Sequence, residues 1–240
     1  MEGFITGYDG GVLSIAVPFA DADILEQKRI TTCDVLLNDG RSISPAQRRK
    51  IFALINDIAS YTSGFDPRRA AFDETLRAMQ LSYLIDITDC EQVRRALTFH
   101  YCSLKDIDLF SLSVRGGETI DMTTAGDFID WLVELCVKFG VPCIDTLLNR
   151  CEDIQRYLYA CVAYRACCIC GRKADIHEVD AAGMGRKRRK LSHRGQRVQP
   201  LCRVHHNEVG QIGQQSFDKK YHLEAVKLDE YLCKKINWRF

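Results

Sequence analysis

The sequence lacks any run of about 18 consecutive apolar residues, the length that a transmembrane helix needs, so we expect no membrane span. Its first residues, MEGFITGYDGG, contain neither the basic nor the apolar segment of a secretory signal, so we expect a cytoplasmic protein. No internal repeat and no low-complexity linker is visible. Hydrophobic residues make up 46% of the 240 residues and charged residues 27%, a balance that excludes a mostly disordered chain. The sequence therefore predicts a folded chain of one large domain or two modest ones.

The net charge of +1 conceals an uneven distribution of charge. Residues 160–240 contain 17 Lys and Arg against 8 Asp and Glu, whereas residues 1–159 contain 16 against 24. A basic C-terminal third is typical of a module that contacts a polyanion, and the phosphate backbone of nucleic acid is the obvious one. Because the charge and the residue types change together, we expect two domains, 1–160 and 161–240.

Hydrophobic patterning predicts a mixed α/β N-terminal domain. Apolar runs at 12–17 and 31–37 predict strands, and alternation over 107–114 predicts another. Helical periodicity and capping signals predict helices over 22–30, 44–61, 68–82, 90–103, 123–139 and 145–165. This part offers no catalytic constellation of its own.

Twelve cysteines are many for a cytoplasmic chain. Nine are scattered, mostly within apolar helical patterns, and we interpret them as small buried hydrophobic residues rather than disulfide partners. These nine are Cys33, Cys90, Cys102, Cys136, Cys143, Cys151, Cys161, Cys168 and Cys233.

The other three cysteines have the spacing of metal ligands. Cys167-x2-Cys170 and Cys202-x2-His205 form two short hooks separated by 31 residues. Each x2 turn aims both ligand side chains at one point, so two hooks can enclose one tetrahedral ion. We therefore predict a structural Zn²⁺ site made by these four residues. Cys168 is the competing ligand, but its spacing of one residue from Cys170 suits tetrahedral geometry less well.

Between the hooks, the pattern predicts a strand at 175–180, a loop at 181–196, a strand at 197–202 and a helix that begins near Arg203. With the segments CCICGRKADIHEVD, GMGRKRRK and LCRVHHNEVGQIG, this order resembles the ββα-metal finger of the HNH endonuclease family, in particular its phage members. The resemblance implies an α+β fold, in which the mixed α/β domain is followed by a zinc-stapled HNH nuclease finger.

The resemblance also implies a catalytic set. In that family the first strand ends in a pair of residues, one of which binds a divalent metal while the next activates water, and the helix carries a further ligand. Here His177 and Glu178 fall on that pair and His206 on the helix ligand. Phosphodiester cleavage needs a base and a hard cation, and neutral imidazole suits either task near pH 7. We expect His177 and His206 to hold Mg²⁺ or Mn²⁺.

Three departures from the family pattern leave alternatives open. Glu178 stands where a second histidine is common, so the roles of base and ligand within its pair are unassigned. Gly210 stands where many members carry the last histidine ligand, and the middle asparagine has no counterpart. Asp180, His193 and His222 are possible substitutes as ligands. Two interpretations follow: an active nuclease with an unusual metal shell, which we favour, or a finger that has kept its zinc and lost its reaction.

A basic run in the loop predicts contact with DNA phosphates. The residues are Arg186, Lys187, Arg188, Arg189 and Lys190 in the loop, with Arg194 and Arg197 beyond it. Each such contact adds affinity through counterion release without reading sequence. No base-reading helix is apparent, so we expect a preference for DNA shape.

The N-terminal part resembles a second family. The stretch RSISPAQRRKIFALINDIA and the later TIDMTTAGDFIDWLVELCVKFGVP are similar to the phage NinB (Orf) recombination-mediator family. This resemblance implies a homodimeric module that binds single-stranded DNA and works with single-strand-binding or strand-exchange proteins, in the host cytoplasm for a phage-encoded chain.

The sequence thus predicts a metal-dependent HNH endonuclease that acts in phage-type DNA recombination or processing. The alternative is a non-catalytic mediator that binds single-stranded or branched DNA and uses the zinc-supported finger as a grip. A third class, a partner-binding adaptor without nucleic acid, is disfavoured by the basic loop.

Overall fold

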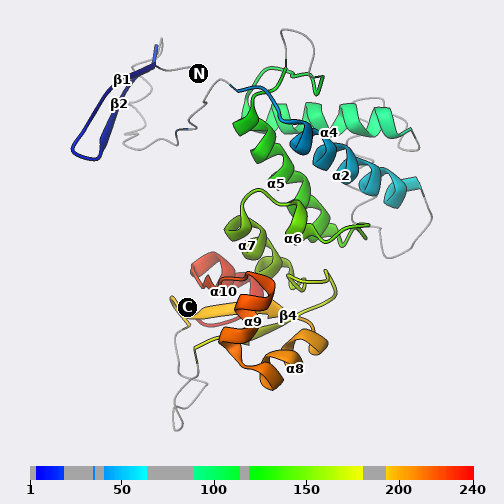
Figure 1. Ribbon diagram of the computed structural model, residues 1–240, viewed down its shortest axis with the longest axis vertical. Coiled ribbons are helices and arrows are strands. Elements are labelled where there is room, and N and C mark those ends of the chain that lie inside the picture. The colour runs from blue at the N-terminus through cyan, green and yellow to red at the C-terminus, as the bar shows by residue number, and fades with distance from the viewer. Residues whose placement is uncertain (1–3, 19–34, 36–40, 64–88, 114–118, 181–192) are drawn as a thin grey trace. The chain divides into compact units, whose positions relative to one another are not determined.

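The computed structural model describes residues 4–18, 35, 41–63, 89–113, 119–180 and 193–240, and the chain divides into two units, Met1–Leu37 and Asn38–Phe240 (Figure 1). In the first unit, β1 (Phe4–Asp9) pairs antiparallel with β2 (Val12–Ala16). Gly10 and Gly11 join them, both with positive φ, as a two-residue hairpin turn requires. The strand expected at 12–17 is confirmed, and β1 is an addition.

Three long helices begin the second unit: α2 (Pro45–Ser63), α4 (Cys90–Lys105) and α5 (Met122–Phe139). α2 packs against both α4 and α5, and the apolar stripe of each helix is buried. The Asp121 carboxylate caps the start of α5 by accepting hydrogen bonds from the backbone, and Gly140, with φ of 64°, ends it. The helices expected over 44–61, 90–103 and 123–139 are confirmed.

Two expectations about this region are wrong. The segment 107–113 is not a strand, because Ser111 forms only an isolated bridge with Thr119 and no strand among the described residues supplies a ladder. The helix expected over 145–165 is broken into α6 (Leu147–Arg150) and α7 (Ile154–Tyr164). The Asp130 carboxylate accepts the backbone N–H groups of residues 152 and 153, which holds the chain in a turn there.

Several expected elements lie outside the described residues. These are the helices at 22–30 and 68–82, the strand at 31–37 apart from residue 35, and Cys33.

The C-terminal part contains a three-stranded antiparallel sheet in the order β3 (Asp175–Glu178), β4 (Arg197–Leu201) and β5 (Val226–Lys227). The helices here are α8 (Arg203–Ile212), α9 (Gln214–Tyr221) and α10 (Glu230–Ile236). α8 contacts β3 and β4, which gives the predicted order of two strands and a helix (Figure 1). With the helices before it, this sheet confirms the α+β fold class.

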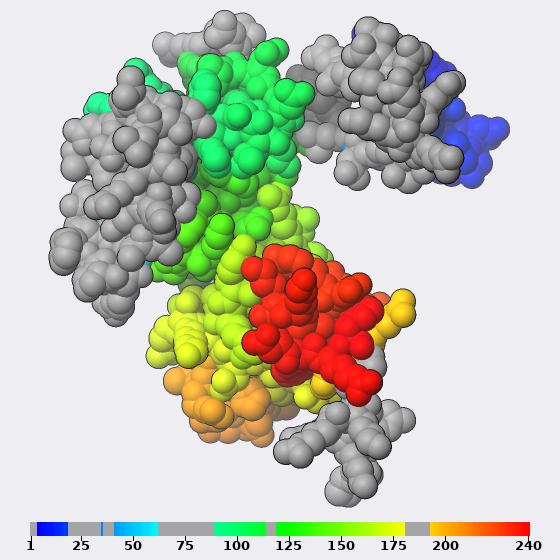
Figure 2. Space-filling view, turned by 180° about the vertical axis from the view of Figure 1, so that it is seen from behind, coloured from blue at the N-terminus to red at the C-terminus, as the bar shows by residue number. Residues whose placement is uncertain are grey.

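Helix α7 connects the two parts of the second unit. It packs against α5 on one side and against β4, β5 and α10 on the other. Figure 2 shows the C-terminal segment, in red, lying against the yellow-green region that includes α7. One apolar cluster therefore runs through the unit, from Ile43 to Ile236. The predicted division at residue 160 falls inside α7 and stays a prediction.

The cysteine interpretation is confirmed for six of the scattered residues. Among the described cysteines, all of which are free, these six are buried: Cys102, Cys136, Cys151, Cys161, Cys168 and Cys233. Cys143 is half-buried, and Cys90 is exposed, contrary to expectation. Of the helices in the described ranges, none has the length and apolar character that a membrane crossing demands.

A buried ion pair supplies a stability prediction for the helical region. Arg150 Nη1 lies 2.5 Å from Asp57 Oδ2, and both side chains are less than a tenth exposed. Removing one partner leaves the other charge buried and unpaired, so Arg150→Met is expected to lower the free energy of unfolding by about 3–5 kcal/mol. Urea denaturation of the protein, followed by circular dichroism, measures this.

The matched control is Arg95→Met. Arg95 pairs with Glu91 at 3.1 Å, but its side chain is 71% exposed, so its loss is expected to cost less than about 1 kcal/mol. Equal losses in the free energy of unfolding for the two substitutions would show that the buried pair contributes no more to stability than the exposed pair.

Candidate metal centre

Four side chains from two distant segments meet beside the sheet. Cys167, Cys170, Cys202 and His205 place their ligand atoms within 4.8 Å of one another. Cys170 Sγ lies 3.7 Å from Cys202 Sγ, and His205 Nδ1 lies 3.3 Å from Cys202 Sγ. Among the described residues, this is the only group of three or more His, Cys, Asp or Glu side chains with such a spacing. The sequence spacing predicted these four residues, and the structure brings them together.

Local backbone geometry explains how the first hook forms. The segment after Cys167 turns back on itself, since Cys167 N donates to Arg172 O and Gly171 N donates to Cys167 O. Gly171 has φ of 68°, a conformation that disfavours any residue with a Cβ. The turn therefore aims Cys167 and Cys170 at one point.

The second hook uses the start of a helix. Cys202 is the residue before α8, in extended conformation, and His205 is the third residue of that helix. Side chains at these two positions lie close together at a helix start. The positive end of the helix dipole also favours a thiolate at this place.

Three of the distances between ligand atoms in the group fit a tetrahedral zinc ion. With Zn–S bonds of about 2.3 Å and Zn–N bonds of about 2.0 Å, tetrahedral angles give an S···S distance of about 3.8 Å and an S···N distance of about 3.5 Å. The observed separations are 3.7 Å between Cys170 Sγ and Cys202 Sγ, and 3.3 Å from His205 Nδ1 to each of Cys167 Sγ and Cys202 Sγ. Three thiols and one imidazole are also a usual donor set for structural zinc. The Cys3His group can therefore bind zinc.

Electrostatics around the group differ between its two hooks. Burial raises the pKa of the Cys167 thiol to about 12. Burial acts in the same direction on Cys202, but the nearby backbone N–H of His205 and the Cys170 thiol outweigh it and lower its pKa. Burial lowers the pKa of His205, which favours the neutral ring that a metal needs. Arg172 donates to Cys170 Sγ at 3.3 Å, a contact that supports a thiolate there.

Cys168, the competing ligand, lies in the main apolar core instead. Its thiol is fully buried, burial raises its pKa, and its backbone carbonyl accepts a hydrogen bond from Tyr157 Oη.

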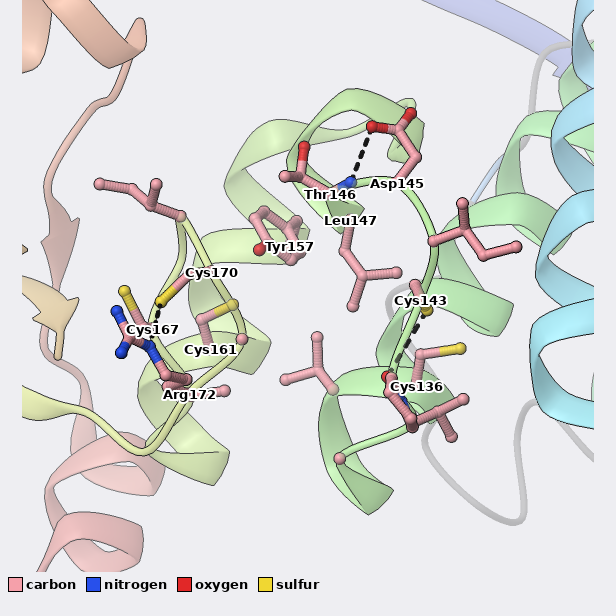
Figure 3. Close-up of a pocket in the computed structure, with 18 residues that line it drawn as sticks. Cys136, Cys143, Asp145, Thr146, Leu147, Tyr157, Cys161, Cys167, Cys170 and Arg172 are labelled. Carbon is pink, nitrogen blue, oxygen red and sulfur yellow. Dashed lines mark hydrogen bonds between the residues drawn. The ribbon is translucent and has the colours of Figure 1, made fainter. Parts of the chain in front are cut away.

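Figure 3 shows Cys167, Cys170 and Arg172 on one side of a cavity of about 370 Å³, with Cys136 and Cys143 on the other. The neighbouring Cys143 thiol, together with burial, raises the pKa of Cys136, so the Cys136 thiol stays protonated at neutral pH.

Two further histidines meet next to the zinc hooks. The rings of His177, on β3, and His206, on α8, have centroids 4.8 Å apart and lie edge to face at 75°. Burial lowers the pKa of His206, and the neighbouring His177 and Arg203 act in the same direction. His206 is therefore neutral near pH 7 and keeps a lone pair for a cation or a proton.

Glu178, the third member of the predicted catalytic set, lies on the other face of the sheet. Successive side chains of a strand point to opposite faces, and His177 faces α8. Asp175 shares the face of His177, but its carboxylate is paired with Arg203 at 3.1 Å. Within the described ranges, no third His, Cys, Asp or Glu joins the pair of histidines to form a metal-binding group.

The three substitute ligands are engaged elsewhere or stand apart. The Asp180 carboxylate binds the Arg197 guanidinium, with Nη2 and Oδ1 2.6 Å apart. His193 Nδ1 lies 2.7 Å from Gln196 Oε1, and its ring packs on Trp238. His222 is exposed at the end of α9. A Cβ at Gly210 would meet no atom within 4 Å, so residue type rather than crowding leaves that position without a ligand.

Sequence reasoning missed three polar residues beside His177. Gln214 Oε1 lies 2.9 Å from His177 Nε2, and the Gln214 amide nitrogen contacts both Gln199 and Asp218. Gln199 is fully buried and stands opposite His177 in the strand register. A glutamine inside the short apolar strand VQPL is the one sequence signal for this group. Its partners on α9 carry no motif.

The predicted DNA contacts divide into two sets. The loop residues Arg186, Lys187, Arg188, Arg189 and Lys190 lie outside the described residues. Arg194 stacks on the Phe240 ring, with its guanidinium carbon 5.3 Å from the ring centroid. Arg197 pairs with Asp180, which offsets its charge. The prediction of phosphate contacts therefore rests mainly on the loop residues, and for them it stays a prediction.

The comparisons with known proteins give one match. A family model described as "Putative HNHc nuclease" matches residues 88–238, more than half of the chain. No curated protein and no solved structure matches. The match confirms the resemblance to HNH nucleases and covers the whole site described above. The NinB resemblance of the N-terminal part stays a prediction.

Proposed function

We propose that this chain, which belongs to the family described as putative HNHc nucleases, hydrolyses phosphodiester bonds of DNA at the His177–His206 pair. The observation that carries this proposal is the approach of the two imidazoles, 4.8 Å between ring centroids, from a strand and a helix that the adjacent Cys3His group ties together. If the rings of His177 and His206 had been too far apart to bind one cation, only a DNA-holding role would have been supported.

The proposed roles follow from the donor types. The Cys3His group would hold a structural Zn²⁺, because thiolates select this ion and all four positions are filled by protein. His177 and His206 would hold a divalent cation that polarises the scissile phosphate and stabilises the leaving oxygen. A neutral imidazole of this pair also accepts a proton from water, so the assignment of base and ligand within the pair is part of the proposal. Glu178, on the opposite face, has no direct part in it.

The ligand set bears on which ion works best. Two imidazoles without a carboxylate suit transition metals, whereas Mg²⁺ prefers oxygen ligands. Of the two ions expected from the sequence, we therefore propose Mn²⁺ over Mg²⁺.

A second function remains a candidate because of one observation: within the described residues the two histidines have no third ligand. A finger that kept its zinc and lost its reaction would serve a mediator that grips single-stranded or branched DNA. The basic loop at residues 186–190 supports DNA binding under either function. We further propose a role in phage-type recombination and binding to single-strand-binding or strand-exchange proteins. A homodimer and a cytoplasmic location are also proposed.

A cleavage assay separates the two functions. Zinc-loaded protein is incubated with labelled single-stranded, duplex and branched DNA in Mg²⁺, Mn²⁺ or EDTA. The nuclease is expected to produce nicks with either ion, faster in Mn²⁺, and none in EDTA. Gel shifts without cleavage in any of these conditions would favour the mediator. The absence of both cleavage and gel shifts would contradict both functions.

A further inference from the structure

We infer that Gln214, Gln199 and Asp218 form a hydrogen-bond relay that fixes the tautomer of His177, so that its Nδ1 is the nitrogen that works in the reaction. The inference rests on the proposed function, which it deepens by assigning an atom and three positioning residues. None of the three belongs to the Cys3His group.

The direction of each hydrogen bond follows from Asp218. A carboxylate only accepts, so the amide nitrogens of Gln199 and Gln214, 2.6 Å and 2.8 Å from Asp218 Oδ1, must both donate to it. The Gln214 amide nitrogen also donates to Gln199 Oε1 at 2.9 Å. Both amide hydrogens of Gln214 are then used, and neither glutamine amide can be flipped without placing an oxygen against the carboxylate.

This orientation determines what His177 does. Gln214 Oε1 can only accept, and it lies 2.9 Å from His177 Nε2. His177 Nε2 must therefore carry the hydrogen, and in the neutral ring the lone pair is on Nδ1. The other nitrogen is the one that the relay leaves for a cation or for the proton of water.

The relay connects strand β4 with helix α9. Gln199 is fully buried on β4, opposite His177, while Gln214 and Asp218 are one turn apart on α9. Strand and helix thus meet at His177 through side chains whose hydrogen bonds satisfy one another. Partners of this kind, which orient a histidine without touching the reacting atoms, typically change metal affinity or activity by about 10–100-fold.

The test combines a spectroscopic and a kinetic measurement on full-length, zinc-loaded protein. Long-range ¹H–¹⁵N correlation spectra of the histidine rings report the tautomer directly. Wild-type His177 is expected to be the Nε2–H tautomer. Gln214→Met, which keeps the length of the side chain but has no amide, is expected to mix the tautomers and to slow cleavage in Mn²⁺ by about 10–100-fold, with unchanged DNA binding.

The control is Gln215→Met, the neighbouring residue on α9, whose side chain is exposed. It is expected to match wild type in both measurements. An Nδ1–H tautomer in the wild type would overturn the inference, and so would a Gln214→Met protein that cleaves like Gln215→Met. If the wild type cleaves no DNA with any ion, the proposed function fails and Nδ1 has no reaction to serve. The spectrum of the wild-type protein tests the tautomer of His177 even if the variants do not fold.

Discussion

Replacing Cys202 by serine is expected to remove zinc from the protein and to destabilise the C-terminal part strongly. Cys202 is one of the four residues of the Cys3His group and is also the residue directly before α8. Structural zinc contributes about 10–16 kcal/mol of binding free energy in small fingers at pH 7, so the loss of one thiolate is expected to lower the free energy of unfolding by more than about 3 kcal/mol. Metal analysis and thermal unfolding, each measured on purified protein, report the two effects.

The control for this substitution is Cys90→Ser. Cys90 is an exposed, free cysteine on α4, outside the group of ligands, so the zinc content and the melting temperature are expected to stay near wild type. A Cys202→Ser protein that retains one zinc per chain with unchanged melting would contradict the assignment of the ligand.

Zinc affinity is also expected to depend on pH. Burial raises the pKa of Cys167 to about 12, so the metal-free thiol is protonated at neutral pH and must lose its proton when zinc binds. Zinc binding therefore releases protons, and the affinity is expected to rise with pH and to weaken as the solution becomes acidic.

The second large effect is expected from His177→Ala. If the ring at this position either accepts the proton from water or holds the cation, its removal is expected to slow DNA cleavage by about 10²–10⁴-fold. Zinc content and DNA binding are expected to be retained, because His177 is outside the Cys3His group and the basic loop. Single-turnover cleavage in Mn²⁺, with gel shifts in EDTA, measures the two properties separately.

His100→Gln is the matched histidine variant. His100 is half-buried on α4, a helix that packs against α2, and its ring lies near Trp131. Its cleavage rate is expected to equal that of the wild type. Undiminished cleavage by His177→Ala would point to a contaminating nuclease.

The sequence predicted most of the metal centre because its parts are local. Each hook is a turn of four residues, and Cys202 and His205 are close through the geometry of a helix start alone, so spacing carries the information. The predicted order of strand, strand and helix likewise follows from short-range periodicity. The resemblance to HNH nucleases pairs Glu178 with His177 at the end of the strand, yet strand alternation puts adjacent side chains on opposite faces.

What the sequence could not predict depends on contacts between distant segments. Gln214 and Asp218 matter only because α9 returns to the sheet beside β4, and nothing in QQSFDKKY indicates this. The alternation over 107–114 predicts a strand, but a strand needs a neighbouring strand. This segment instead buries Leu112 in the main apolar core while Leu109 stays exposed. The break before α7 depends on Asp130, more than twenty residues earlier.

The position of α7 has a practical consequence for dissecting the chain. A fragment that starts at residue 161 would lose Tyr157, whose hydroxyl supports the backbone at Cys168 beside the first zinc hook, and Leu158, which is fully buried. The faces of β4, β5 and α10 that α7 covers would then become exposed to solvent. A fragment of the C-terminal part suitable for crystallisation should therefore start no later than Asp153, the residue that caps α7.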